Sequence, residues 1–208
     1  WSGTGLVTTS PFTIDLRSGV RNALTPLNLP VTYTNTGNAL VDGWNLVGNP
    51  VPSPIDFSLL ALTNVDNFYY VFDPVSGNNA AWDEGLGVSI PGGSLNGNIQ
   101  SFQGFWVKAN TAAPVVTVEE TDKVLDLNGG GLFGGSQQGA APMFRLELSN
   151  AMNAFFDETL VHFGTGGPTS GDTHDLVKFT FSHPEAPQVM TRTSDGQDMT
   201  LNAWGPLT

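Results

Sequence analysis

Short strand-like segments separated by turn signals recur along most of this 208-residue chain. Gly, Pro, Asn and Asp gather between the segments, and the chain holds 25 Gly and 14 Pro, which are residues that favour turns. This spacing is typical of β-sandwiches and jelly rolls. The expected strands lie within Gly5–Leu16, Leu29–Tyr33, Trp44–Val47, Phe68–Phe72, Gly104–Lys108, Val115–Glu119, Phe144–Leu148, Thr159–Phe163, Leu176–Phe181, Gln188–Thr191 and Thr200–Asn202.

The composition agrees with a fold built from strands. Charged residues make up 12% of the chain, against about 25% in an average protein, so the strong helix formers Lys and Glu are scarce. Hydrophobic residues make up 39%, which is enough for a substantial core. We therefore predict an all-β, jelly-roll-like β-sandwich, in one unit or two packed halves. One or two helical turns are expected within Pro54–Leu62, with Ser53 as the N-cap.

A Gly-rich stretch divides the chain. Residues 128–142 show no hydrophobic periodicity and are expected to form a linker or long loop. This predicts an N-terminal β-sandwich region at 1–127 and a C-terminal β region at 143–208. The second region holds few strands, so it is expected to be truncated and to need other strands at its sheet edges. Residues 129–134 match G-x-G-x-x-G formally, but no βαβ pattern surrounds them, so dinucleotide binding is not expected.

Charge and residue types exclude several classes of function. The net charge is −12 with 7 basic residues, so neither nucleic acid nor an anionic membrane surface is an expected partner. No apolar run reaches the roughly 20 residues of a membrane helix, so no membrane insertion is expected. The absence of Cys excludes disulfides and thiolate sites. The chain opens at Trp1 without Met, which is expected of a processed product or fragment.

Two motifs carry a family resemblance. Residues 43–57 read GWNLVGNPVPSPIDF, and residues 99–109 read IQSFQGFWVKA. With the weaker segments FRLELSN, DETLVHF and HDLVKF in the same order, the chain resembles the conserved region upstream of the sorting domain in type IX secretion substrates of Bacteroidetes. The resemblance covers nearly the whole chain. The family usually has Tyr and Trp where this sequence has Val51 and Phe57.

This resemblance implies a location and a role. It implies a secreted or cell-surface protein, in which this region is a non-catalytic accessory module for structure or adhesion. The expected partner is then a protein or a surface glycan, and the chain is not expected to be an enzyme. The oligomeric state is left open by the sequence.

The residues themselves offer candidates for a ligand site. Trp82 lies in a polar, Gly-rich stretch, where an exposed indole ring could stack on a sugar while Asn78, Asn79 and Asp83 bind its hydroxyls. Trp106 is a second candidate platform. The alternative is that Trp82 anchors a loop to the sheet and Trp106 belongs to a second core. These candidates support a carbohydrate-binding module as the alternative function.

No cofactor is expected apart from a possible calcium ion. Asp172 and Asp175 lie in the Gly-rich segment 164–175, which could wrap a cation with its carbonyl groups, although no EF-hand spacing is present. Solvated turn carboxylates are the alternative. His174 next to Asp175 could belong to a hydrolase triad, and this makes a hydrolase the third and least favoured class. His162 is expected to be an ordinary sheet residue.

Overall fold

The computed structural model describes residues 23, 25–38, 41–125, 142–164, 170–172, 174–180 and 182–206. These residues form fifteen strands and two single-turn 3₁₀ helices, and no α-helix occurs among them. The prediction of an all-β protein is therefore confirmed. The expected strand at Gly5–Leu16 and nearly all of the Gly-rich segment 128–142 lie outside the described residues.

A central antiparallel sheet carries the two motifs of the family resemblance. Its strands pair in the order β2-β9-β5-β6-β7. Trp44 of β2 lies opposite Lys108 of β9, so the GWNLVGN and QGFWVKA motifs are neighbouring strands. Gly43 precedes β2 with a φ of +78°, and a Cβ there would lie 2.1 Å from the Ala109 carbonyl oxygen. The bounds are β2 Trp44–Gly48, β5 Phe68–Asp73, β6 Asn78–Asp83, β7 Val88–Ile90 and β9 Gly104–Lys108.

Two small sheets cover one face of the central sheet. One pairs in the order β1-β10-β4, and the other joins β3 and β8. The 3₁₀ turn η1 follows β3, and Asp56 caps it by accepting a hydrogen bond from the Ser58 amide at 2.9 Å. The expected cap at Ser53 is wrong because the chain is still extended through Asp56. The bounds are β1 Leu27–Asn28, β3 Ile55–Asp56, β4 Ala61–Thr63, β8 Asn98–Ile99, β10 Val115–Val118, η1 Phe57–Leu59 and η2 Glu120–Asp122.

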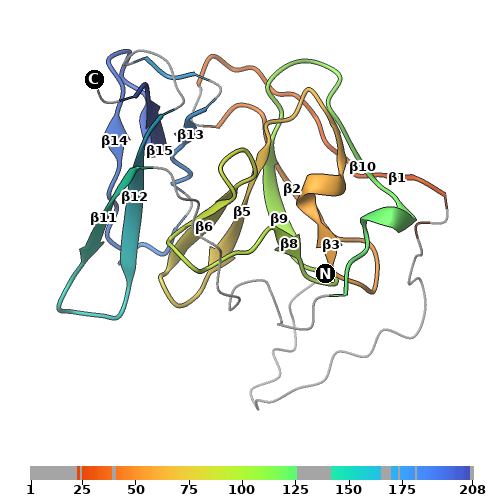
Figure 1. Ribbon diagram of the computed structural model, residues 1–208, viewed down its shortest axis with the longest axis horizontal. Coiled ribbons are helices and arrows are strands. Elements are labelled where there is room, and N and C mark those ends of the chain that lie inside the picture. Colours follow the sequence, from red (N-terminus) through yellow and green to blue (C-terminus); the bar gives the residue numbers. More distant parts are fainter. Residues whose placement is uncertain are drawn as a thin grey trace.

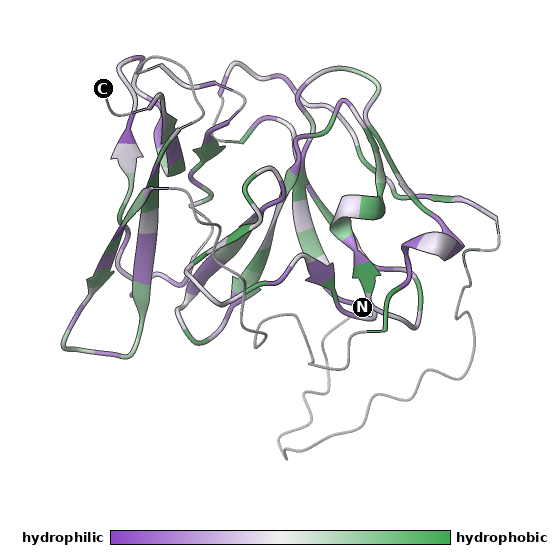
Figure 2. Cartoon of the chain, in the orientation of Figure 1, coloured by the Kyte–Doolittle hydropathy of each residue, from purple (hydrophilic) through white to green (hydrophobic). Residues whose placement is uncertain are grey.

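A five-stranded sheet covers the other face. Its order is β11-β12-β15-β13, with β14 also paired to β15, and β12 and β15 run parallel to each other. Hydrophobic and hydrophilic residues alternate along β11 (Figure 2). Met143 and Arg145 are partly buried, whereas Phe144, Leu146 and Leu148 are exposed. The bounds are β11 Met143–Ser149, β12 Phe156–Phe163, β13 Leu176–Val177, β14 Thr191–Arg192 and β15 Asp198–Trp204.

The sheets stack in three layers, with the central sheet shared by two hydrophobic cores (Figure 1). Tyr69 and Phe105 belong to the first core, while Tyr70 of the same strand as Tyr69 belongs to the second. Burial on both faces explains why residues 68–71 read FYYV without alternation, whereas Phe72 near the end of the strand is exposed. The sheets lie face to face as in a sandwich, and the second core joins strands from both sides of the Gly-rich segment.

The Pro-rich loop after β2 is held by one buried side chain. Asn49 is 2% exposed, and its amide nitrogen donates to the carbonyl oxygens of Ser53, Ile99 and Gln100 at 2.8, 3.2 and 3.0 Å. Its amide oxygen accepts from the Val51 N–H at 3.0 Å. These bonds satisfy backbone groups that prolines leave unpaired. The motif is therefore a structural buttress, with Val51 buried in the first core.

Candidate functional site

A cleft of about 830 Å³ lies between one end of the central sheet and the sheet of β11–β15. The ends of β5, β6 and β9 form one wall, and the segment before β13 and the start of β15 form the other. Its walls combine carboxylates, amides, one lysine, one histidine and apolar side chains. The residues lining it are Val65, Asp66, Asn67, Phe68, Asp83, Gly85, Leu86, Lys108, Asn110, Gly171, Asp172, His174, Asp175, Val177, Gln197 and Met199.

Asp83 enters the cleft at the end of β6. The chain turns directly after it, and one oxygen of its carboxylate accepts a hydrogen bond from the Leu86 amide at 2.7 Å. Its side chain is nearly buried, with 8% of the residue exposed. Burial raises the pKa of Asp83 to about 6, and the nearby Glu84 adds to the rise. Asp83 is thus ionised near neutral pH at a cost in free energy.

Asp66, Lys108 and Asn110 meet where β5 lies beside β9. The Asp66 amide donates to the Lys108 carbonyl at 2.8 Å, and the Asn110 side chain donates to the Asp66 carboxylate at 2.8 Å. Burial raises the pKa of Asp66 and lowers the pKa of Lys108. The Lys108 ammonium lies 5.7 Å from the centre of the Trp44 ring, within range of a cation–π contact.

Asp172, His174 and Asp175 form the opposite wall. Asp175 accepts hydrogen bonds from the Asp172 amide at 2.8 Å and the Ala203 amide at 2.7 Å, so it fastens this segment to β15. Asp172 accepts from the His174 amide at 2.8 Å. Burial raises the pKa of Asp175. These bonds occupy carboxylate oxygens that the calcium hypothesis would use.

The structure does bring Asp172 and Asp175 to one wall of the cleft. Across the described ranges, no group of three or more His, Asp or Glu side chains is arranged to hold a metal ion. The calcium site therefore stays a prediction.

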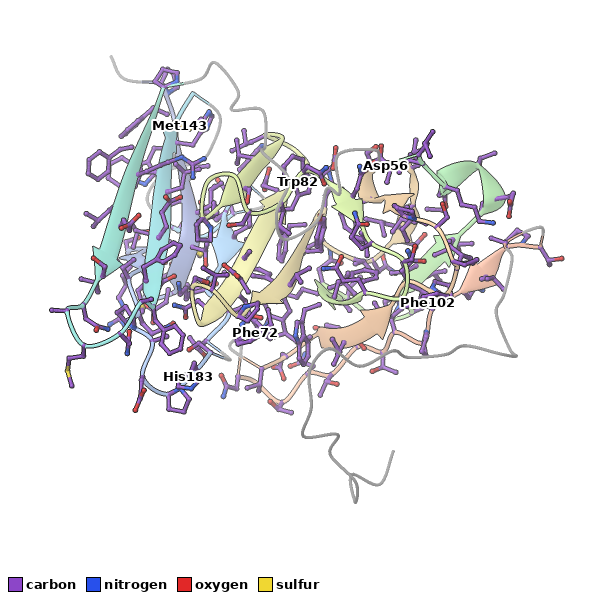
Figure 3. All side chains as sticks on the ribbon, turned by 90° about the horizontal axis from the view of Figure 1, so that it is seen from below. Asp56, Phe72, Trp82, Phe102, Met143 and His183 are labelled. Carbon is purple, nitrogen blue, oxygen red and sulfur yellow. The ribbon has the colours of Figure 1, made fainter. Side chains whose placement is uncertain are left out.

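The polar residues around Trp82 suggested a loop, but Trp82 does not lie in one. It belongs to strand β6, is 7% exposed and packs in the first core. Its indole nitrogen donates to the Glu84 carboxylate at 2.8 Å, and Gly97 lies against its ring. Figure 3 shows Trp82 midway along the row of sheets. The expectation of an exposed stacking ring is wrong, because β3, β8 and η1 cover the face of the hairpin that carries Trp82.

Asn78 and Asp83 stand at opposite ends of β6, about 17 Å apart at the usual rise per residue. Asn78 is 2% exposed, and its side chain donates to the carbonyl oxygens of Phe156 at 2.8 Å and Pro187 at 3.2 Å. Asn79 is also buried. Trp82 and the three residues that the sequence grouped with it therefore do not converge on one site, and only Asp83 lines the cleft.

Trp106 is partly buried against the second core. Its ring centre lies 4.9 Å from that of Phe179, and it stands opposite Tyr70 in the central sheet. The second-core alternative is the one that the structure supports. An exposed platform at Trp106 is not present.

The hydrolase hypothesis finds little support in the geometry. His174 Nδ1 lies 3.2 Å from the Asp172 carboxylate. The hydrolase hypothesis instead paired His174 with its neighbour Asp175. No Ser or Thr is among the described residues that line the cleft. His162 lies in β12 and is 2% exposed, as expected of a sheet residue.

Sequence reasoning missed Asp66, Lys108 and Asn110 as site residues. Each lies at or just beyond the end of an expected strand, which is where binding residues often gather. Their meeting depends on β5 pairing with β9, and nothing in a single sequence gives that pairing.

No protein-family description, curated protein or solved structure matches this chain. Within the described residues, no helix has the length and apolar character needed to span a lipid bilayer.

Proposed function

We propose that this chain is a non-catalytic, structural and adhesive module of a secreted or cell-surface bacterial protein. In this proposal it holds a protein partner through the edge strand β11. The observation that supports it best is a row of exposed apolar side chains on that edge. The resemblance to secretion substrates, stated above, supports the location.

The apolar row follows the period of a strand. Phe144, Leu146 and Leu148 are 56%, 47% and 43% exposed, and they alternate with Arg145 and Glu147. Among the described residues, β11 pairs with β12 alone and ends the sheet order. Figure 1 shows it at the outer margin of the molecule. Exposed apolar side chains gathered on one strand mark an interaction surface more often than scattered ones do.

The row continues onto neighbouring strands. Val161 of β12 lies opposite Phe144, and Phe163 of β12 stacks edge-on with Trp204 of β15, with their ring centres 6.1 Å apart. Trp204 is 43% exposed. The surface formed by Phe144, Leu146, Leu148, Phe163 and Trp204 is called the β11 surface below.

The occupant that fits is an extended strand of another protein. A seven-residue edge strand offers unpaired backbone N–H and C=O groups to such a strand. Backbone hydrogen bonds would supply affinity, and the apolar row would select alternate apolar side chains of the partner. A glycan fits less well, since Trp82 and Trp106 pack against the two cores and the exposed Trp204 stands edge-on to Phe163 within the apolar surface.

The proposal is tested by surface plasmon resonance with the whole chain immobilised. The analytes are defined panels of purified extracellular and bacterial surface proteins and of polysaccharides. Binding to at least one protein is expected, with Leu146→Asp weakening it at least tenfold. Glu147→Gln changes the adjacent exposed residue and should leave it unchanged. Retention on a glycan alone, or equal binding by Leu146→Asp, would overturn the proposal.

The proposed location has a separate test. Intact cells of the producing bacterium are treated with protease, and the chain is followed by antibody in cells and medium. Digestion on intact cells, or presence in the medium, is expected. Complete protection that is lost only on lysis would contradict the location.

A further inference from the structure

The cleft described above has two kinds of wall. Val65, Phe68, Leu86, Val177 and Met199 provide apolar surface from both the central sheet and the sheet of β11–β15. Carboxylates, amides, Lys108 and His174 provide the polar part. A volume of about 830 Å³ is within the range of small-ligand sites, which also combine apolar walls with a few polar groups.

The charges in the cleft are unbalanced. Asp66, Asp83, Asp172 and Asp175 line it, against Lys108 and His174. Asp83 and Asp175 are 8% and 7% exposed. Across the described residues, Asp66, Asp83 and Asp175 form no ion pair, and the hydrogen bonds that they accept come from backbone amides and Asn110. Burial has the largest effect and raises the pKa of all three, although Lys108 favours the ionised form of Asp66, and His174 favours those of Asp83 and Asp175.

We propose that this cleft binds an alkylammonium group, the chemistry carried by a lysine side chain or a small alkylamine. The ammonium would lie among Asp66, Asp83 and Asp175, and the alkyl chain along Phe68, Leu86 and Met199. This site is independent of the β11 surface, so either proposal can fail alone.

The choice between a cation and a neutral sugar follows from desolvation. A sugar could donate hydroxyl hydrogen bonds to the same carboxylates, but it would remove water from them and supply no charge. The cost of burying a carboxylate is offset best by an opposite charge within hydrogen-bonding distance. A neutral ligand would thus raise the cost of the ionised form, while an ammonium group would lower it.

Lys108 is the cleft residue that opposes such a ligand. Its ammonium faces the Trp44 ring at 5.7 Å, and it also lines a smaller hollow of about 370 Å³ together with Asp66 and Asn110. The Lys108 ammonium would repel a second ammonium group bound in the same cleft. Replacing Lys108 with Met keeps most of the side-chain volume and removes the charge, so it should strengthen binding of an alkylammonium probe.

The test is isothermal titration calorimetry of the whole chain with Nα-acetyl-lysine amide. The matched control ligand is its Nε-acetylated form, which has the same backbone and no charge. Binding of the charged probe at least tenfold tighter than the acetylated one is expected. 1,5-Diaminopentane extends the test to a free amine, and glucose, galactose and CaCl₂ represent the competing ligand classes.

Variants of the cleft residues test whether the probe binds in the cleft. Asp83→Asn should weaken the charged probe at least tenfold, Lys108→Met should tighten it severalfold, and Glu185→Gln, an exposed carboxylate elsewhere, should leave it unchanged. Circular dichroism melting confirms that each variant folds. No difference between the two lysine probes, binding of sugars or calcium alone, or equal loss in Glu185→Gln would overturn the proposal.

Discussion

The two faces of the central sheet are buried in different ways. On the first face, Val47, Tyr69 and Phe105 pack against hydrophobic side chains of the two small sheets. On the second face, hydrophobic packing is accompanied by directed polar contacts between layers. Arg145 of β11 pairs with Glu158 of β12 and donates to the Ser89 carbonyl of β7 at 3.0 Å.

Further polar contacts cross the second interface. The Tyr70 hydroxyl donates to the Val177 carbonyl at 3.0 Å, and Asn78 donates to the Phe156 carbonyl at 2.8 Å. Apolar contact has no preferred direction, whereas hydrogen bonds fix both distance and angle. Hydrogen bonds also cross the first interface, where the Tyr69 hydroxyl donates to the Asn98 carbonyl at 3.4 Å and the Asn49 side chain donates to the Ile99 carbonyl at 3.2 Å. The second interface differs in that an arginine paired with a carboxylate, Arg145 with Glu158, takes part in its polar contacts. The cleft opens at the second interface, where side chains leave space between those layers.

The largest effect is expected in the first interface. Phe105 is fully buried, so Phe105→Ala should lower the free energy of unfolding by about 3–5 kcal/mol. Phe72 lies in the same sheet and is 46% exposed, so Phe72→Ala should cost about 1 kcal/mol or less. Urea unfolding followed by Trp fluorescence measures both. Similar losses in the two variants would show that the first interface is not a closed core.

The next effect concerns a buried ion pair in the sheet that forms the second interface. Lys178 and Asp157 are both 4% exposed, with Nζ 2.5 Å from the carboxylate, and Asp157 also accepts from the Val189 amide at 2.6 Å. Burial lowers the pKa of Lys178, although Asp157 opposes this. Lys178→Met leaves Asp157 buried without a cation and should cost about 3–4 kcal/mol.

A double variant separates the pair from its surroundings. Adding Asp157→Leu to Lys178→Met removes the buried carboxylate that has lost its cation. Part of the lost stability should therefore return, despite the loss of the Val189 contact. Chemical unfolding of the two single variants and the double variant measures this. If the losses simply add, the two groups are not coupled.

The sequence predicts the fold class better than it predicts how the sheets pack into layers. The FRLEL strand was recognisable because apolar and charged residues alternate along it, and the QGFWVKA strand because it contains a short apolar run. Strand β6 was missed because NNAAWD has polar ends that look like a loop, yet they are buried by contacts with β12 and by the turn after Asp83. The cleft depends on pairings between distant segments, so a sequence alone gives Asp83 and Asp175 as acidic residues but not as neighbours of one cavity.

The pH dependence should be set mainly by the second interface. Asp83 has a pKa of about 6 in the folded state, raised by burial from an ordinary value near 3.8. Between these values the folded chain binds a proton that the unfolded chain does not, so stability increases as the pH falls from about 7 to about 4. Two pKa units correspond to about 2–3 kcal/mol. Burial raises the pKa values of Asp66 and Asp175 in the same direction.

Thermal melting between pH 7.5 and pH 4.5 measures this dependence. Wild type should melt at a higher temperature at pH 5 than at pH 7.5, and Asp83→Asn should have a smaller difference because its side chain does not titrate. Asp83→Asn should also be more stable than wild type at pH 7.5. A wild-type melting temperature that falls with pH, or an unchanged slope in the variant, would contradict this.

The smallest effect compares two tryptophans, one in the first core and one on the β11 surface. Trp82 is 7% exposed and donates to the Glu84 carboxylate at 2.8 Å, while Trp204 is 43% exposed and donates to Asn202 at 2.6 Å. Trp82→Phe removes a partly buried hydrogen bond to a charged group and some packing against Gly97, so a loss of about 1 kcal/mol is expected. Trp204→Phe should cost less, because water can replace its exposed contacts. Differential scanning calorimetry distinguishes the two, and a larger loss for Trp204→Phe would mean that the β11 surface contributes to the fold itself and is less available to a partner.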